Sequence, residues 1–537
     1  MATVREMREV RSMKTVSIFN HVLGPVMRGP SSSHTAGAFH IGCMARSILG
    51  GTPRRAVLAF DPAGSYSVTY AAQGADRGFA MGLMGRPLTE ESFFTALQDA
   101  GQAGMEIAFE VRKLAESDHP NTVDMDLTAA DGSALRLVAR SIGGGEVQIT
   151  SLDGRPVRFD GSAYETLVEV SADKAASAGA LLAGDGQVLE EICDSHGNGL
   201  VQLTARRKTP LPATFRDELR AMDSGARVWE STPVYFVQKG LALFYSAAEM
   251  VRKAEQMGRS LGELALAYEA QLLGISEAEV LAEMLRRYDI MVRSVERGLD
   301  ANFTGLQLLP ACAGAIFSAE AAGRLSVRSL NTRAAARALA VMHVNGAMGV
   351  VCAAPTGGSA GVLPAVLVTL AEERSLTREQ IGLALLAAGS IGVILAIRGT
   401  FAAEVAGCQV EIGAAGAMAA AAVVDAVGGT ARQACDAAAI GFQNTMGSVC
   451  DLVQGMVEIP CHTRNAVAAA SAFVNADLVL GGYTNPIPLD ETIDAVYAVG
   501  LAMPSELRCT SKGGLAIAPS AQDLKPGCCT SGGAGCS

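Results

Sequence analysis

The feature of this sequence that most limits its fold is an alanine- and glycine-rich block from Ala334 to Val427. Such small side chains allow helices to pack closely, and strand-like patterns nearly vanish after Phe215. Inside the block, Ile381–Ile397 is apolar apart from glycines and one serine, which is at the short edge for a membrane span. Because Glu379 and Arg398 flank this run, we expect a helix buried among other helices and no membrane span.

The first third of the chain alternates between strand-like and helix-like patterns. Helical periodicity covers Ser92 to Leu114. The segments that read as short strands are Ala56–Phe60, Ser65–Tyr70, Thr122–Leu127, Ala134–Ala139 and Val147–Thr150. Tight turns at Asp131-Gly132 and Gly143–Gly145 separate the later strands. These patterns predict an α/β domain over residues 1–155.

Three further segments complete the predicted organisation. Residues 156–210 alternate strand, helix and strand, which indicates a small α/β linker or regulatory module. Residues 211–522 should form a large all-α domain, and residues 523–537 a cysteine- and glycine-rich tail. The predicted class is therefore α+β multidomain, with an N-terminal α/β domain followed by a large all-α catalytic domain.

Composition and charge narrow the class of protein. Residues are 49% hydrophobic and 18% charged, and the formal charge of -11 leaves no basic stripe for nucleic acid. The segment Met1–Lys14 lacks the apolar core and cleavage site of a secretory signal. Twelve cysteines are too sparse for a disulfide scaffold in a chain of 537 residues. We expect a cytoplasmic protein with reduced thiols and no nucleic-acid partner.

Three cysteines stand in polar or glycine-bearing surroundings: Cys408, Cys450 and Cys461. Three thiolates could hold a metal or cluster and leave one position open for a substrate. A free cysteine is also among the most buried residue types and often only packs, which suits Cys43, Cys312, Cys352 and Cys435. The three cysteines lack the paired spacing of a zinc site, so spacing alone specifies no metal.

The segment Gly29–Thr35 places four hydroxyls and an imidazole just before a predicted helix over Ala36–Leu49. Backbone N–H groups and hydroxyls at a helix start can bind a carboxylate. The other interpretation is an ordinary serine-rich helix cap. Because the segment carries more polar groups than a cap needs, we predict a binding role for Ser31, Ser32, Ser33, His34 and Thr35.

A second irregular segment, Ala353–Gly361, interrupts two apolar helices. Irregular backbone in a buried region needs partners for its polar groups. The segment is therefore either a ligand-binding turn, with Thr356, Gly357 and Ser359 on it, or a plain helix–helix connection.

Together these segments resemble the iron–sulfur-dependent L-serine dehydratases (L-serine ammonia-lyases) in single-chain form. Motifs similar to the β region of that family are Gly24–Met27, Gly29–Gly37 and Ser141–Gly145. Motifs similar to its α region are Ala353–Thr356, Gly407–Gln409, Pro460–Cys461 and Thr510–Ala516. The resemblance extends over most of the chain.

The resemblance implies a four-iron four-sulfur cluster on Cys408, Cys450 and Cys461, and no pyridoxal phosphate. The fourth iron would act as a Lewis acid on the β-hydroxyl of the substrate while a base removes the Cα proton. The enamine that results would hydrolyse to pyruvate and ammonia. The polar groups of Ser31–Thr35 would hold the substrate carboxylate, and Thr356–Ser359 would line the same pocket.

The sequence departs from the family pattern at three places. Gly74–Gly78 lacks a usual histidine, Gln443–Thr445 replaces Glu-His-Asn, and His462–Arg464 replaces the usual Glu-Arg. His34 remains, and we predict that it is the catalytic base. The family can also cap the open iron with a cysteine near the C-terminus. Of Cys528, Cys529 and Cys536 we favour Cys536, because it is penultimate.

The expected substrate is L-serine, a small amino acid, in amino-acid catabolism and gluconeogenesis. Cysteine, threonine and an acidic 3-hydroxy amino acid are alternatives. The acidic substrate is considered because Arg77 or Arg464 could pair with its additional anionic group. Another alternative is a non-catalytic iron–sulfur or amino-acid sensor that kept the fold. The resemblance also implies a homodimer.

Overall fold

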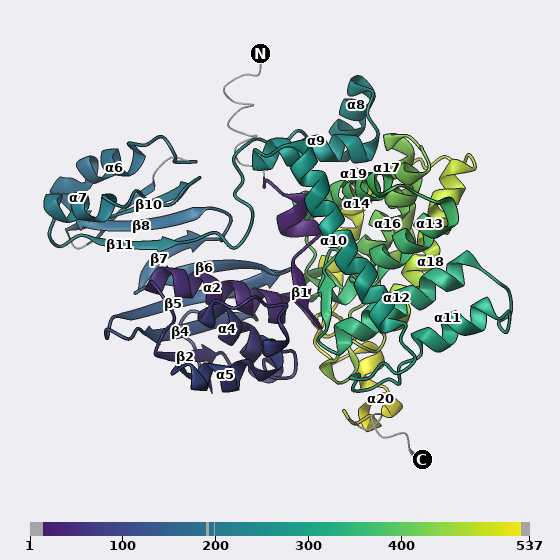
Figure 1. The fold of residues 1–537 in the computed structure, drawn as a ribbon, viewed down its shortest axis with the longest axis horizontal. Helices are drawn as coiled ribbons and strands as arrows, with labels where there is room; N and C mark the ends of the chain where they lie inside the picture. Colours follow the sequence, from purple (N-terminus) through teal and green to yellow (C-terminus); the bar gives the residue numbers. More distant parts are fainter. Residues whose placement is uncertain (1–13, 190–192, 198, 528–537) are drawn as a thin grey trace. The chain divides into compact units, whose positions relative to one another are not determined.

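The computed structural model describes residues 14–189, 193–197 and 199–527. The chain divides into two compact units, one of residues 33–239 and one of residues 1–32 with 240–537 (Figure 1). Each unit has its own apolar core. One unit contains mixed sheets and the other is almost entirely helical, which confirms the predicted α+β class.

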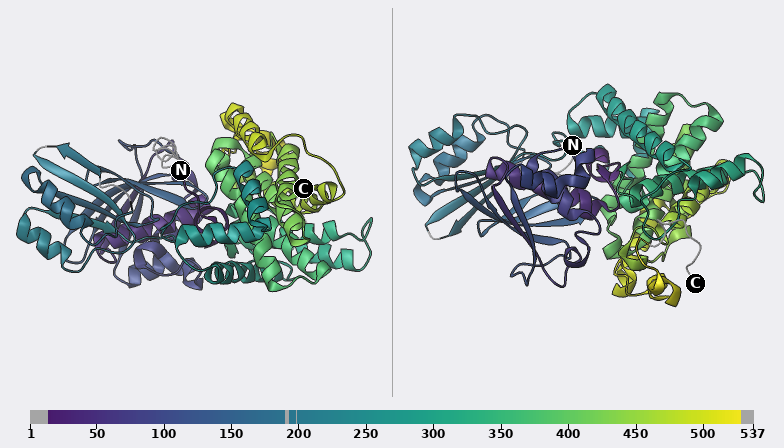
Figure 2. Two further views of the ribbon diagram at one scale, coloured as in Figure 1. Left: turned by 90° about the horizontal axis from the view of Figure 1, so that it is seen from above. Right: turned by 60° about the horizontal axis from the view of Figure 1, so that its bottom comes forward.

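The helical unit is built around α14 (Arg378–Arg398) and α16 (Ile412–Ala426), which pack on each other (Figures 1 and 2). The other main helices of this unit are α8 (Ala247–Met257), α9 (Leu261–Leu273), α10 (Glu277–Gly298), α11 (Ala313–Ala321), α12 (Leu330–Gly346), α13 (Val362–Arg374), α17 (Ala431–Thr445), α18 (Cys461–Leu480) and α19 (Leu489–Ala502). Short helices α15 (Ala403–Ala406) and α20 (Pro519–Asp523) complete it.

Local sequence explains where many of these helices begin. A serine or threonine caps α9, α10, α14 and α17, and a glutamate or glutamine three residues later returns the hydrogen bond. Such a capping box satisfies two backbone N–H groups that would otherwise lack partners. The chain start joins this unit as a short strand, β1 (Val26–Arg28), antiparallel to β12 (Val350–Cys352).

The alanine- and glycine-rich block packs as predicted. The stretches Arg378–Arg398 and Cys408–Ala426 are long and apolar enough to cross a membrane, and 83% and 89% of an apolar 18-residue window in each lies buried within the fold. Close approach explains the glycines: a Cβ on Gly389 would lie 2.5 Å from the Ile18 side chain, and one on Gly392 would lie 2.2 Å from Val22. Burial on this scale is typical of core helices.

The other unit contains a six-stranded sheet with the order β3-β2-β4-β5-β6-β7. Its strands are β2 (Arg55–Phe60), β3 (Glu106–Val111), β4 (Thr122–Thr128), β5 (Ala134–Gly143), β6 (Glu146–Leu152) and β7 (Arg155–Phe159). Only the β2–β3 pair is parallel. Helix α2 (Gly37–Leu49) packs on β5, β6 and α4 (Ala75–Met84).

Two secondary-structure predictions in this unit were wrong. Ser65–Tyr70 contains the short helix α3 (Tyr66–Thr69), in which Tyr66 is fully buried and donates a hydrogen bond to the Ser33 carbonyl at 3.1 Å. This tertiary contact overrides the alternating pattern. Ser92–Leu114 is not one helix, because α5 (Ala96–Gln102) ends before Gly104, whose φ of 80° is favoured by glycine. Strand β3 follows and pairs with β2.

A second sheet in the same unit forms a small module. Its order is β11-β8-β10-β9, from β8 (Tyr164–Ser171), β9 (Cys193–Gly197), β10 (Leu200–Arg207) and β11 (Arg227–Ser231). Helices α6 (Ala175–Ala183) and α7 (Phe215–Met222) connect these strands in a βαββαβ pattern. The module continues past residue 210, the boundary expected from sequence, because α7 and β11 complete its core and sheet.

The stability of this module should fall as the pH rises from about 4.5 to about 8. The carboxyl of Glu165 is fully buried on β8, and burial raises its pKa from 4.5 to about 8. The folded module therefore binds more protons than the unfolded chain in this window. Each pH unit should cost at most about 1.4 kcal/mol. Urea unfolding followed by Trp229, the single tryptophan, which lies on β11 beside β8, measures this effect.

Glu165→Gln is the matched variant for this measurement, because its amide does not ionise. The variant loses an acceptor for the backbone N–H of Asp160 or Gly161, which the Glu165 carboxyl binds at 2.7 and 2.8 Å. We expect it to be less stable than the wild type at pH 5 and to approach it by pH 8. Parallel stability curves for the two proteins would contradict the assignment.

Candidate active site

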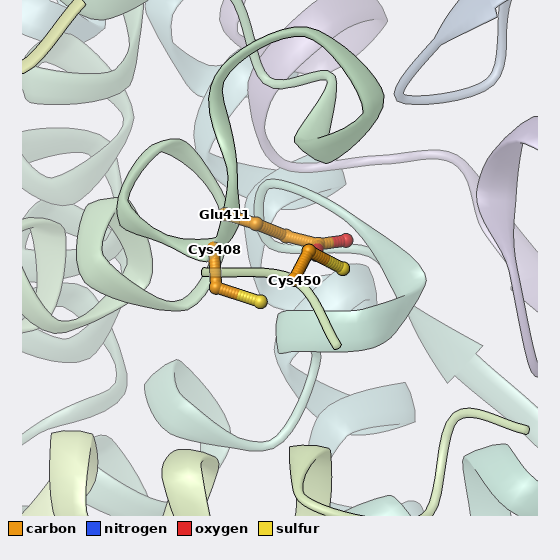
Figure 3. Close-up of side chains that lie close together, drawn as sticks. All are labelled: Cys408, Glu411 and Cys450. Carbon is orange, nitrogen blue, oxygen red and sulfur yellow. The ribbon is translucent and has the colours of Figure 1, made fainter. Parts of the chain in front are cut away.

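The helical unit brings together a set of metal-ligating side chains, of which the two cysteines are buried and the carboxylate is partly buried. The thiols of Cys408 and Cys450 and a carboxylate oxygen of Glu411 lie within 4.8 Å of one another (Figure 3). Each cysteine is only 1% exposed. Cys408 opens a 3-10 turn just before α16, and it follows Gly407, where a Cβ would lie 2.6 Å from the Ser448 carbonyl.

Two more thiols belong to this set. The Cys450 thiol lies near the thiols of Cys408 and Cys509, and both neighbours raise its pKa. Cys461, the first residue of α18, is 3% exposed and interacts electrostatically with Cys408, Glu411 and Cys509. The three cysteines singled out from the sequence therefore come together with a fourth, Cys509.

The sequence did not predict Cys509 as part of this set, because Cys509 lies outside the family-like motifs. The available signal was its position, directly before the segment Thr510–Ala516 that resembles the family. In the structure its backbone N–H donates to the Cys450 carbonyl at 2.8 Å, so the two cysteines are tied together by the main chain.

The surroundings of these thiols favour the neutral thiol over the thiolate. Contact with Cys408 and burial raise the pKa of the Cys450 thiol well above its usual range, and burial also raises that of Cys461. Neighbouring thiolates repel one another, and a bound cation removes that repulsion. A buried set of thiols with one carboxylate nearby is a donor set that suits iron–sulfur clusters or zinc.

Arg464 places a positive charge beside this set. Its guanidinium lies 3.7 Å from the Cys408 sulfur and donates to the Val449 carbonyl at 2.8 Å. It also pairs with Asp451 at 2.9 Å, and the Asp451 carboxylate accepts the Leu515 N–H at 2.8 Å. Arg464 is thus held in place by a buried carboxylate beside the thiols.

The Ala353–Gly361 segment lies against the carboxylate of the set. The Thr356 hydroxyl donates to Glu411 at 2.5 Å and is 3.0 Å from the Ser359 hydroxyl. A Cβ on Gly358 would lie 2.8 Å from the Glu411 carboxylate, which explains a glycine there. Burial raises the pKa of Glu411 to about 7, which the Thr356 hydrogen bond partly opposes.

Asn465 connects the same segment to the helix that carries Cys461. Its amide nitrogen donates to the carbonyls of Gly358 at 2.8 Å and Cys461 at 2.9 Å. Its oxygen accepts the Gly361 N–H at 3.2 Å. Asn465 is fully buried, so these contacts fix the Thr356–Ser359 turn relative to the cysteines.

The first part of the serine-rich segment also reaches this turn. A Cβ on Gly357 would lie 3.0 Å from the Pro30 carbonyl and 3.2 Å from the Ser32 N–H, so the two chain segments touch. Asn345 on α12 donates to the Pro30 carbonyl at 3.0 Å and holds it there. Ser31 is half-buried and Ser32 is buried.

The rest of that segment, Ser33, His34 and Thr35, belongs to the other unit and is buried there. It forms one turn, Ser32–Ala36, that precedes α2. The Nε2 atom of His34 is 3.1 Å from the Ser65 hydroxyl, and the Thr35 hydroxyl donates to the Gln73 carbonyl at 3.0 Å. Burial lowers the pKa of His34 to about 4, so its imidazole is neutral near pH 7.

A cavity of about 310 Å³ opens beside Cys408 between α16, α17 and α18. Its lining includes the small residues Gly413, Gly416 and Gly441 and the polar residues Thr445, Arg464 and Asn475. Its volume suits a small molecule, and it brings polar groups to the thiol set.

The positions that depart from the family pattern do not all face the thiols. His462 packs against His343, with ring centroids 5.4 Å apart, and both side chains are buried. Asn444 donates to the Ile440 carbonyl on its own helix at 3.0 Å and also lines the cavity. The tail cysteines Cys528, Cys529 and Cys536 lie outside the described residues.

An all-helical domain that holds buried thiols, a carboxylate and a neighbouring cavity defines a class: a protein with a candidate thiolate metal centre. Comparison with known proteins then identifies the family. Residues 240–516 match the family "Serine dehydratase alpha chain". The chain belongs to this family, which confirms the resemblance and the expectation of an enzyme.

Individual relatives match the same part of the chain. A probable L-serine dehydratase alpha chain from Bacillus subtilis is 36% identical over 283 residues, which cover 53% of this chain and 94% of that protein. The L-serine dehydratase alpha chain of Peptoniphilus asaccharolyticus is 35% identical over 281 residues, 52% of this chain and 96% of that protein. L-serine dehydratase TdcG of Escherichia coli is 35% identical over 285 residues, 51% of this chain and 62% of that protein.

Proposed function

We propose that this enzyme is an L-serine ammonia-lyase that converts L-serine to pyruvate and ammonia with a four-iron four-sulfur cluster. The relatives named above are called L-serine dehydratases, and the family match contains all the thiols of the set. The observation that carries the proposal is the close group of Cys408, Cys450 and the Glu411 carboxylate, with Cys461 near enough to interact electrostatically with Cys408 and Glu411. The proposed reaction uses no pyridoxal phosphate.

In this proposal the three thiolates hold the cluster. When bound, the cluster supplies a Lewis acid that makes the substrate β-hydroxyl a better leaving group. Arg464 offsets the negative charge of the thiolates through its position beside Cys408. Cysteine on a helix start, as at Cys461, also benefits from the positive end of the helix dipole.

The chain's own polar groups would position the amino acid. Hydroxyls and backbone N–H groups of Ser31, Ser32, Ser33 and Thr35 would hold its carboxylate. The turn of Thr356, Gly357 and Ser359 would line the same pocket, supported by the hydrogen bond from Thr356 to Glu411 and the contact of Gly357 with Ser32. The Glu411 carboxylate, when ionised, suits the α-ammonium group of the substrate.

His34 would remove the Cα proton. A general base must be unprotonated at the working pH, and the lowered pKa of His34 meets that requirement. The Ser65 hydroxyl at its Nε2 atom fixes the ring orientation. The Tyr66 ring packs edge-on against it, 5.3 Å between centroids, which restricts its rotation further.

Anaerobic reconstitution with iron and sulfide, followed by a pyruvate assay on L-serine, tests the proposed function. We expect pyruvate and ammonia in equal amounts from L-serine. A panel with L-cysteine, L-threonine and an acidic 3-hydroxy amino acid separates the alternative substrates. A fully reconstituted protein that forms no pyruvate from L-serine would overturn the serine assignment, and one inert toward the whole panel would favour a sensor.

We further propose a cytoplasmic enzyme of amino-acid catabolism that feeds gluconeogenesis through pyruvate, and a homodimer. Exposed apolar residues along α18 support a subunit contact: Val467 is 64% exposed, Val474 48% and Leu478 44%.

Residues 164–231 are proposed as a small regulatory module, because their βαββαβ pattern has its own core.

A further inference from the structure

Helix α18 carries an apolar face on the surface of the helical unit. Val467 is 64% exposed, Val474 48% and Leu478 44%. The spacings of seven and four residues between them place their side chains on the same side of the helix. A helix face turned to water is normally polar or charged, so an exposed apolar stripe of this kind indicates a contact surface.

The same face is uncharged over most of its length. Between Arg464 and Asp477 the helix contains no charged residue. Ala470 and Ser471, in the middle of this stretch, are small and partly buried, so another helix can approach closely there. The face from residue 463 to residue 478 is about 24 Å long at 1.5 Å per residue. This length allows a helix-to-helix contact over several turns.

The residues of this face are arranged symmetrically along the helix. Val467 and Val474 are equally far from the midpoint between residues 470 and 471. Arg464 and Asp477, which have opposite charges, are also equally far from that midpoint. In a two-fold contact between copies of one chain, each residue meets the partner's residue from the other side of the axis. An antiparallel pair of α18 helices therefore sets valine against valine and brings unlike charges to the same end of the contact.

We propose that a second copy of this chain binds this face, and that the two α18 helices pack antiparallel with the two-fold axis between Ala470 and Ser471. Val467 of each copy then lies opposite the partner's Val474. This inference rests on the homodimer of the proposed function and specifies where the two copies meet. A face with charge of one sign would repel its own copy, whereas this face is neutral at its centre and oppositely charged at its ends.

This contact would also complete the cavity beside Cys408. Thr463 and Val467 are exposed and Ser471 is partly buried, and all three line that cavity. Because they are four positions apart along α18, they form one ridge of the helix. A partner helix that packs on the face covers this ridge, so each copy would supply a wall to the cavity of the other.

The test compares the full-length wild type with Val467→Glu and with a matched control, Val327→Glu. Val327 is 65% exposed in the loop between α11 and α12, so the control places the same charge at equal exposure away from α18. Light scattering over a dilution series of the anaerobically reconstituted proteins measures their mass. We expect the wild type and the control to be dimers of about twice 55.3 kDa. Burying uncompensated carboxylates costs several kcal/mol, so Val467→Glu should raise the dimer dissociation constant at least about 100-fold.

A pair of opposite charges tests the antiparallel register. Val467→Glu combined with Val474→Lys places each introduced carboxylate opposite an introduced ammonium group of the partner. The two positions are about 10 Å apart along one helix, so pairing within a chain is weak. We expect the double variant to bind its own copy at least about tenfold more tightly than Val467→Glu does. Val467→Glu combined with Val474→Glu should stay monomeric.

Other outcomes would contradict this contact. A dimeric Val467→Glu variant would show that the copies meet elsewhere, and dissociation of the Val327→Glu control as well would show a non-specific effect of charge. A double variant that binds no more tightly than Val467→Glu would refute the antiparallel register.

A monomeric wild type would refute the homodimer itself. None of these measurements depends on pyruvate formation, so they leave the L-serine assignment to its own assay. Circular dichroism and unfolding temperatures check that every variant is folded. Val474→Glu, at a position that is 48% exposed, repeats the test if Val467→Glu does not fold.

Discussion

Cys408→Ala should abolish the brown absorbance of the reconstituted enzyme and nearly all of its production of pyruvate. Cys408 is 1% exposed, and its sulfur lies near the Cys450 thiol and 3.7 Å from the Arg464 guanidinium, so alanine removes one of the three proposed ligands from the centre of the set. Loss of the Lewis acid removes several kcal/mol of transition-state stabilisation, which lowers the turnover rate by about 10³-fold or more. Iron content, visible absorbance and pyruvate formation measure the effect together.

The matched control is Cys435→Ala, which removes a cysteine of similar burial that packs in the apolar core. We expect the control to keep its iron and its activity while it loses a little stability, because only a small buried group is removed. Equal loss of the absorbance in both variants would refute the assignment of Cys408 as a ligand. Full retention of the cluster in Cys408→Ala would refute it as well.

Much of the helical unit could be predicted from the sequence because its pattern is strong and local. The run Ile381–Ile397 is apolar on all sides, and only a buried helix satisfies its backbone and its side chains together. Capping residues such as Thr377 and Thr430 mark helix starts through hydrogen bonds to their own chain neighbours. Such signals do not depend on distant parts of the molecule.

The errors arose where distant contacts decide the structure. Tyr66 lies in an alternating segment, but the hydrogen bond from its hydroxyl to Ser33 and its packing against Phe60 favour a helix. Strand β3 follows a helix in a segment with helical periodicity, and its pairing with β2 determines its state. Neither interaction is visible in a short window of sequence.

In the candidate site, too, some residues could be predicted from sequence and others are recognised only from their contacts in the fold. Cys408, Cys450 and Cys461 could be chosen from their surroundings and from the family resemblance, although they are far apart along the chain. Glu411 could not, because a carboxylate one turn after Cys408 acquires meaning only from its contacts. The sequence signal for Cys509 was weaker, because only its position before the segment Thr510–Ala516 points to it. Asn465 is a further example, since its role is to connect Cys461 with Gly358.

His34→Asn should lower the turnover rate by about 10²–10⁴-fold and leave the cluster absorbance unchanged. The magnitude is that of a positioned general base. The imidazole of His34 is buried and neutral, with its Nε2 atom 3.1 Å from the Ser65 hydroxyl, and asparagine keeps a polar group of similar reach that cannot take up a proton. Steady-state pyruvate formation should show the loss in kcat, with a smaller change in KM.

The pH profile gives a second readout for the same residue. An unprotonated base is required, and burial lowers the pKa of His34 from 6.5 to about 4. Activity that depends on this group should therefore persist as the pH falls through 6.5 and decline only toward pH 4, wherever the cluster remains intact. A decline centred near 6.5 that disappears in His34→Asn would show that His34 acts with an ordinary pKa, contrary to this expectation.

His40→Asn is the matched control, because His40 lies on α2 close in sequence to His34, and burial lowers its pKa to about 4 as well. Its Nδ1 atom is 2.9 Å from the Gly145 carbonyl and 3.1 Å from the Tyr235 hydroxyl, so its partners are structural. We expect His40→Asn to lower the unfolding temperature and to keep kcat within a few fold of the wild type. If both variants lost kcat equally, the loss would belong to the fold of this segment, and the base would have to be sought elsewhere. A loss confined to His34→Asn, with full iron content, is what distinguishes proton removal from cluster binding.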